Sequence, residues 1–472
     1  MDGAASGTER AIQQPSSGKA IYDLAVRLYP LCRSLAGDGV RETLAIIGEH
    51  LPLTVHQVPT GTSLYDWKAP QEWIIREAYI ADMNGNRMVD FAQHNLHVVN
   101  FSVPVRARMP LSALKEHIHT LPDQPDLIPY RTCYHAEGWG FCMAHREFLS
   151  MQDGDYDVVI DAERRDGFLT FGEFIHRGET DETFILSAHL CHPSLANDNC
   201  SGLALLTHLG TVLQSRRTRL TYRLLFGPAT FGALAWLQRN EDQLELVRHG
   251  LVLSCIGDAG GPNYKRSRRG DADIDHIMGH VLAKCANATM HDFWPYGYDE
   301  RQFCSPGFNL PVGMFQRSLY GAFPEYHTSA DNLDFIKPDY LEQSFNMVLQ
   351  AIEIAEKLVS AEHLAEGEAQ LGRRGLYGSM GGDSGAAQNA MALLWVLNLA
   401  DGEHSILDMA VRAKLPFATL ADAADRLREA DCSKQRPGQI LVGNDAWPVR
   451  PRYAERRVVI AQTRRIIRCI GL

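Results

Sequence analysis

The sequence of 472 residues lacks long apolar runs and any compact group of cysteines. Its most apolar stretches, such as residues 185–190 and 251–256, are far shorter than the roughly 20 residues that a membrane span requires. The ten cysteines include no C-x-x-C pair, which favours reduced thiols over a disulfide framework. No basic start followed by an apolar stretch is present, so we expect no secretory signal and a cytoplasmic location.

Positive charge is also scarce. There are 46 Lys and Arg residues against 57 Asp and Glu residues, which gives a formal net charge of −11. Because a nucleic-acid partner requires a basic surface, we expect neither nucleic acid nor a membrane as the partner. The hydrophobic class makes up 45% of the residues and the charged class 22%, values typical of a globular chain.

The pattern of apolar residues changes along the chain. A polar lead-in is followed by helix-like spacing, then by a region of short strands, and from about residue 166 by alternating strands and helices. That alternation predicts an α/β domain with a mixed sheet flanked by helices. A Gly-rich passage and three helix-like segments follow, with an arginine-rich, strand-like pair at the end, which is similar to a winged helix. The expected ranges are lead-in 1–18, helical start 19–52, β-rich region 53–165, α/β region 166–360, linker 361–385 and winged-helix-like module 386–472.

The segment SAHLCHPSLANDNCSG, residues 187–202, carries the strongest chemical signal. It places His189 at the end of an apolar strand and Asp198 in a loop before a helix. Ligand sites in open α/β sheets lie at such strand ends, and His and Asp suit zinc. The residues alone leave two interpretations, half of a metal site or a hydrogen-bonded histidine beside a helix-capping group.

A second segment, EYHTSADN at residues 325–332, places His327 between Glu325 and Asp331. This loop suits a metal ligand or an acid–base pair, and it equally suits a surface histidine among solvated carboxylates.

Taken together, the two segments are similar to those of the co-catalytic zinc aminopeptidases. More closely, the chain resembles a bacterial family of aminopeptidase-like proteins that is often associated with polysaccharide biosynthesis. The matching stretches are RSLAGDGVRETL, IPYRT, WGFCM, HLCHPSLANDN, YDERQFCSPGFNLPVG and EYHTSADNLDFI. The resemblance implies a zinc-peptidase-like domain (19–52 and 166–360), a β-rich insertion and a winged-helix-like module.

The resemblance also implies a ligand set for Zn²⁺, with about one ion per chain. His189, Asp198 and His327 fall on ligand positions of the family. Asp258 takes the place of an aspartate ligand at a strand end, although Cys255 competes for that alignment.

Three positions depart from the zinc aminopeptidases. Cys191 replaces the carboxylate that orients the first histidine. Ala229 and Thr230 stand where two glutamates would supply the general base and another ligand. Losing the base removes a factor of about 10²–10⁴ from hydrolysis. Glu325 and Glu300 are the substitutes that the sequence offers as catalytic groups.

Two further groups are candidates for substrate binding. Arg268 and Arg269 belong to the basic run 264–271, which either grips an anionic substrate group or is a solvated charge run. Tyr298 ends the aromatic run 293–298, which either lines a pocket or belongs to the core.

These observations support a metal-dependent, aminopeptidase-like enzyme that acts on an amide bond of an amino-acid-like or peptide-like substrate in a biosynthetic pathway. Without the glutamates, the same site could instead carry out aminoacyl transfer, cyclisation or another tailoring step. A non-catalytic binding module is the third hypothesis. For the C-terminal module we favour packing or homo-oligomer formation over DNA binding, because the chain is acidic.

Overall fold

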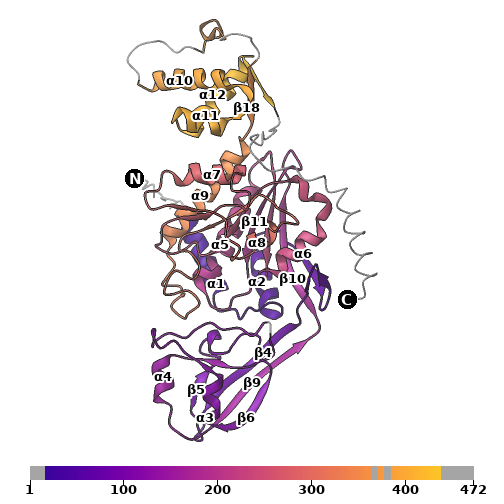
Figure 1. Cartoon of the computed structure of the whole chain (residues 1–472), viewed down its shortest axis with the longest axis vertical. Coiled ribbons are helices and arrows are strands. Elements are labelled where there is room, and N and C mark those ends of the chain that lie inside the picture. Colours follow the sequence, from indigo (N-terminus) through magenta and orange to yellow (C-terminus); the bar gives the residue numbers. More distant parts are fainter. Residues whose placement is uncertain (1–15, 135, 364–368, 377–383, 437–472) are drawn as a thin grey trace, which may run out of the picture. The chain divides into compact units, whose positions relative to one another are not determined.

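The computed structural model describes residues 16–134, 136–363, 369–376 and 384–436 (Figure 1). The chain divides into two compact units, Met1–Lys357 and Leu358–Leu472. Helix α1 begins at Ser17, so it starts before the expected lead-in ends; residues 1–15 lie outside the described part. In the described part, no helix has the length and apolarity that a bilayer span requires.

The first unit is built on an eight-stranded mixed sheet, in the order β1-β10-β12-β11-β13-β16-β14-β15. Strands β12, β11, β13 and β16 run parallel to one another, whereas β1, β10 and β14 bring antiparallel pairings. Because the parallel strands end at one edge, the loops that follow them meet there. The strands are β1 (Thr54–Pro59), β10 (Phe168–His176), β11 (Thr183–His189), β12 (Thr221–Gly227), β13 (Val247–Leu253), β14 (Asn263–Lys265), β15 (Thr289–His291) and β16 (Val312–Gln316).

Helices cover the central strands, as the apolar strand sequences predict. All seven residues of β11 and of β12 are buried. Ile185 of β11 packs in one core with Trp236 of α6 and Phe303 of α8, while α5 contacts β11 and packs with α1 and α9. The mixed α/β fold predicted from the sequence is confirmed. The helices of this layer are α1 (Ser17–Leu28), α2 (Asp38–Gly48), α5 (Gly202–Gln214), α6 (Phe231–Arg239), α7 (Asp273–Leu282), α8 (Glu300–Phe303) and α9 (Pro338–Glu356).

A separate four-stranded antiparallel sheet, in the order β5-β4-β9-β6, lies between β1 and β10 in sequence. Its own core includes Trp73, Phe141 and Ile160. Strand β1 pairs with β10 in the main sheet, although the sequence assigned residues 54–59 to the insertion. The elements here are β2 (Ser63–Leu64), β3 (Trp67–Lys68), β4 (Glu72–Ala81), β5 (Arg87–Asp90), β6 (Val105–Pro110), α3 (Leu111–Leu114), β7 (Ile118–His119), β8 (Phe141–Cys142), α4 (His145–Ser150) and β9 (Asp155–Arg165).

The second unit has the elements of a winged helix: three helices and a small sheet of order β18-β17-β19. Helix α11 starts with a capping box, in which Ser405 and Asp408 each bond the other's backbone N–H. Residues 361–363, expected as part of a linker, instead belong to strand β17, which pairs with β18 and β19. The expected terminal strand pair and its arginines, residues 437–472, lie outside the described residues. The elements are β17 (Ser360–His363), α10 (Ser384–Leu399), β18 (Asp401–Ser405), α11 (Ile406–Ala413), α12 (Phe417–Glu429) and β19 (Ser433–Arg436).

A buried ion pair ties β12 to β10. The Nε atom of Arg223 donates to Oε1 of Glu173 over 2.7 Å, and the indole N–H of Trp236 donates to the same oxygen over 2.8 Å. We expect Arg223→Met to lower the free energy of unfolding by about 3–5 kcal/mol, because it leaves the buried carboxylate of Glu173 without its arginine partner. Urea unfolding measures this, and Arg223→Met with Glu173→Gln should recover part of the loss. A double variant no more stable than Arg223→Met would contradict this account.

Candidate metal centre

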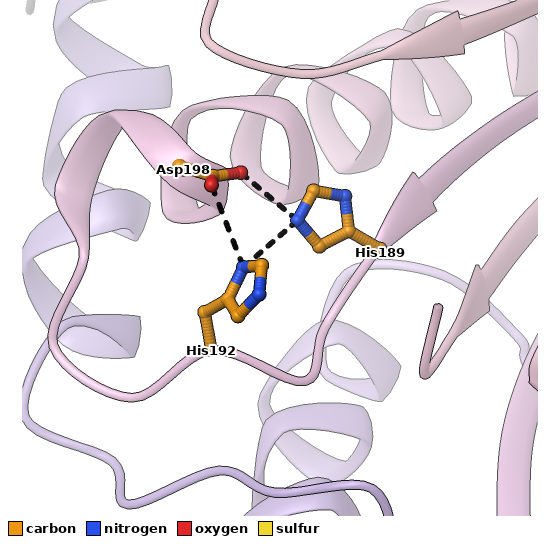
Figure 2. A group of neighbouring side chains, drawn as sticks. All are labelled: His189, His192 and Asp198. Carbon is orange, nitrogen blue, oxygen red and sulfur yellow. Dashed lines mark hydrogen bonds and ion pairs between the residues drawn. The ribbon is translucent and has the colours of Figure 1, made fainter. Parts of the chain in front are cut away.

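A histidine, a second histidine and an aspartate converge at the end of β11 (Figure 2). The Nε2 atom of His189 lies 3.0 Å from Oδ1 of Asp198 and 3.1 Å from Nδ1 of His192. His192 Nδ1 is 3.6 Å from the other Asp198 oxygen. The ligand atoms of these three residues all lie within 4.8 Å of one another. The C-terminal edge of the sheet therefore holds a compact group of side chains of the types that bind metal ions.

His327 reaches the same carboxylate from a distant loop. Its Nε2 atom lies 3.1 Å from Oδ2 of Asp198. The side chain of His327 is 32% exposed, whereas those of His189 and Asp198 are completely buried. His327 therefore stands on the solvent side of the group.

Two buried polar side chains fix the loop that carries these ligands. The carboxylate of Asp331 accepts the backbone N–H groups of Asn197 over 2.6 Å and Asp198 over 3.0 Å. Arg33 donates to the carbonyl oxygen of His192 over 2.8 Å and to Sγ of Cys200 over 3.0 Å. Both side chains are almost fully buried, so they determine the backbone path of the loop.

Tyrosines surround the imidazoles. The hydroxyl of Tyr298 donates to Oδ2 of Asp198 over 2.8 Å, and its ring stacks on His189 with centroids 4.4 Å apart. The ring of Tyr326 stacks on His327 at 3.9 Å, and its hydroxyl lies 2.9 Å from that of Tyr298. Burial raises the pKa of both tyrosines well above the usual range, so both hydroxyls keep their protons.

The inserted region supplies another wall of the site. Tyr130 meets His192 and His327 edge-on, with centroids 5.2 Å and 5.1 Å apart. The backbone N–H of Tyr130 donates to the carbonyl oxygen of His327 over 2.8 Å, and Pro129 forms an antiparallel bridge with Thr328. The IPYRT segment is therefore hydrogen-bonded directly to the loop of His327.

The chemistry of the group fits a zinc ion. Burial opposes the charge on Asp198, but His192, His189 and His327 hold its pKa well below the usual range. Burial lowers the pKa of His192 and of His327, which favours the neutral imidazole that metals bind. Two imidazoles and a carboxylate are a donor set that catalytic zinc sites use.

Comparisons with known proteins identify the family of the chain. The family described as a domain of unknown function, DUF4910, matches residues 22–358. The chain belongs to the DUF4910 family. A winged helix-turn-helix family matches residues 359–434, downstream of the DUF4910 domain.

A relative of this chain and a similar crystal structure both come from Clostridium acetobutylicum. One is 46% identical over 420 residues, which cover 89% of this chain and 96% of the relative, and is named a polysaccharide biosynthesis protein with an aminopeptidase-like domain. A crystal structure of a candidate peptidase from that organism has a TM-score of 0.84 at 44% identity, over 89% of this chain and 97% of the other. The resemblance expected from the sequence is confirmed.

The zinc aminopeptidase of Bacillus subtilis shares the fold of the DUF4910 domain. Its structure has a TM-score of 0.53 at 14% identity and covers 72% of this chain and 95% of the other. This likeness establishes the fold.

The structure brings together three of the four expected ligands. His189, Asp198 and His327 meet, whereas Asp258 lies outside the group. Both oxygens of Asp258 are occupied by donors from Asn197, Gly260 and Ser318. His192 was not predicted as a ligand; its only signal in the sequence is its position three residues after His189.

Cys255, which competes with Asp258 for the aspartate position of the family alignment, lies near Asp198. Burial, and next the charge of Asp198, raise the pKa of its thiol well above the usual range. Ser254 donates to Oδ1 of Asp198 over 3.2 Å. The end of β13 therefore presents Ser254 and Cys255, rather than a carboxylate, to Asp198.

The residues expected to act in catalysis or substrate binding have different surroundings in the structure. Glu300 is buried in an ion pair with Lys265, at 2.8 Å. Glu325 is half-buried two residues before His327. Arg268 and Arg269 donate to the side chain and the backbone of Asn309. Tyr298 is at the site.

Where the two glutamates were expected, the chain presents small side chains. Ala229 and Thr230 follow β12, and the buried hydroxyl of Thr230 has no hydrogen-bond partner among the described residues. In the stretch WGFCM, residues 139–143, Trp139 stacks on His117 and Phe141 is part of the core of the insertion.

We expect zinc to stabilise the protein through His192. Binding to the folded state adds about 2.7–4.1 kcal/mol when free zinc is 100–1,000 times the dissociation constant. The measurement is the melting temperature with and without zinc for wild type, His189→Ala and His192→Ala. His208→Ala on helix α5 is the matched control, which should keep the full zinc response. An equal zinc response in His192→Ala and wild type would contradict this ligand assignment.

Asp299, at the start of α8, should make stability depend on pH. Burial raises its pKa to about 7; Ser187 donates to one of its oxygens over 3.1 Å, and the other oxygen has no partner in the described structure. The folded state therefore holds a proton that the unfolded chain loses near pH 4, so stability falls as pH rises from about 4 to about 7. We expect Asp299→Asn to gain about 2–3 kcal/mol on wild type between pH 5 and pH 8, measured by urea unfolding. An unchanged difference between the two proteins would show that Asp299 is charged at both pH values.

Proposed function

We propose that this chain is a zinc-dependent enzyme that cleaves an amide bond in a small amino-acid-like or peptide-like substrate of a biosynthetic pathway. The observation that carries the proposal is the group formed by His189, His192 and Asp198 at the C-terminal edge of the sheet. The name of the Clostridium acetobutylicum relative supports a role in polysaccharide biosynthesis.

We assign about one zinc ion per chain to these three residues, with His327 beside them. When bound, zinc supplies a Lewis acid that polarises a carbonyl group and lowers the pKa of water. A second metal lacks support, because Ala229 and Thr230 replace the two glutamates of the co-catalytic pattern.

The protein's own groups then have separate tasks. Tyr298 holds the carboxylate of Asp198 by its hydrogen bond. Tyr130 and Tyr326 flank the imidazoles and limit the access of water to the site. Both oxygens of Glu300 are occupied, one by the ammonium group of Lys265 and the other by the N–H of Tyr298, so this carboxylate is not open to a substrate. We therefore assign the role of general base to Glu325.

A transfer or cyclisation reaction is the second candidate. The absence of both glutamates favours it, because a reaction in which a substrate group replaces water depends less on a base that activates water.

For the C-terminal unit we propose packing or self-association rather than DNA binding. Helix α12 has three acidic and two basic residues, a poor match to phosphate. Sedimentation velocity of the full chain tests the self-association.

We expect zinc-loaded protein to turn over aminoacyl-anilides at well below the ordinary range of about 1–10³ s⁻¹. The reason is the missing glutamate base, so Ala229→Glu should raise the rate. The assay is a panel of aminoacyl-anilides, dipeptides and N-acyl amino sugars, with His192→Ala as the inactive control and Glu325→Gln as the test of the base.

The panel separates the candidates. Hydrolysis of any amide that is lost in His192→Ala supports the proposal. No hydrolysis by zinc-loaded protein contradicts it and favours transfer or binding. Aminoacyl-anilide turnover in the ordinary range would show that another residue already acts as the base.

A further inference from the structure

A completely buried ion pair lies next to the candidate metal centre. Lys265 on β14 and Glu300 on α8 are both inaccessible to solvent, and Nζ lies 2.8 Å from Oε1. The desolvation of two charges costs several kcal/mol per ion, so such a pair is poor evidence for a stabilising role. Its contacts indicate what else it does.

The pair is enclosed by the aromatic run 293–298. The ammonium group of Lys265 lies 4.7 Å from the ring centre of Phe293 and 4.4 Å from that of Trp294. It also donates to the carbonyl oxygen of Tyr296 over 2.8 Å. The run is therefore wrapped around one cation, which it contacts through two rings and one carbonyl oxygen.

Glu300 holds the end of the same run. Its Oε2 atom accepts the backbone N–H of Tyr298 over 2.9 Å. The backbone of Gly297 packs directly against this carboxylate, since a Cβ atom on Gly297 would lie 1.8 Å from Oε1 of Glu300. The ion pair thus determines where the backbone of Tyr298 lies.

Tyr298 in turn contacts the metal-binding group. Its hydroxyl donates to Asp198, and its ring covers His189. Hydrogen bonds to a ligating carboxylate orient it, and their loss typically costs 10–100-fold in metal affinity.

We propose that Lys265 and Glu300 are positioning residues that set the orientation of Asp198 through Tyr298, and so tune metal affinity from outside the ligand set. This inference rests on the proposed metal centre. Neither residue touches the ligands; each acts through the backbone of residues 296–298.

The test measures zinc affinity of the full chain by competition with a chromophoric chelator, and the visible spectrum of the cobalt-loaded protein. We expect Tyr298→Phe to lower zinc affinity about 10–100-fold. Lys265→Met with Glu300→Gln, which removes both charges at similar size, should lower it in the same range and shift the cobalt spectrum. Adding Tyr298→Phe to that pair should cause little further loss, because residues that act through one another are not additive.

The matched control is the buried ion pair of Arg223 with Glu173. Arg223→Met with Glu173→Gln also removes a buried pair, four residues before the strand end at Gly227, which pairs with His189. It should lower the melting temperature and leave zinc affinity unchanged. If Lys265→Met with Glu300→Gln behaves like this control, the pair is only structural and the inference is wrong.

Two other outcomes are decisive. Additive losses with Tyr298→Phe would show that the pair does not act through Tyr298, which overturns the inference while the metal centre stands. If wild type binds neither zinc nor cobalt, the proposed metal centre itself fails. Should the double variant not fold, Tyr320→Phe removes the hydroxyl that donates to the Tyr296 carbonyl over 2.6 Å. It should give a smaller affinity loss, absent in a Tyr298→Phe background, and an unchanged affinity would contradict the proposal.

Discussion

Asp198 carries a negative charge in a completely buried position, and a charge removed from water must be matched by donors. His189, His192 and His327 approach its oxygens, and Tyr298 donates to one of them. These partners come from a strand end, two separate loops and the segment before α8. The need to satisfy one carboxylate therefore explains why distant parts of the chain meet here.

The backbone around Asp198 is under the same constraint. Asp331 accepts two consecutive N–H groups of its loop, and Arg33 holds the carbonyl oxygen of His192. Burial raises the pKa of Asp331 to about 8, with the charge of Asp198 acting in the same direction. Two acidic groups thus lie close together, and in the described structure the imidazoles of His189, His192 and His327 contact Asp198.

Local patterns in the sequence predicted the layers of the fold and the strand end at His189, because a continuous apolar run is a property of a few adjacent residues. The loop around His327 suited either a ligand or a surface histidine, and only the family resemblance placed His327 in the expected ligand set. His192 was missed although its partners His189 and Asp198 lie in the same short segment. Tyr130 and the role of Glu300 were missed for a common reason. Each depends on a contact across the chain, such as Lys265 with Glu300, that no spacing rule contains. Asp258 is the opposite case. Its residue type and its position after a strand suited a ligand, but in the structure donors from Asn197 and Ser318 occupy its oxygens.

The pairing of β1 with β10 has a consequence for how the molecule assembles. Thr54 pairs with Glu173, so the main sheet closes a loop of more than a hundred residues that contains the whole insertion. Closing such a loop costs free energy that grows only with the logarithm of its length, but contacts so distant in sequence slow folding. Tyr130 lies within this loop and His327 far beyond it, yet their backbones are hydrogen-bonded. The site therefore has all of its walls only when the insertion packs against the loop of His327, two segments that lie far apart in the sequence.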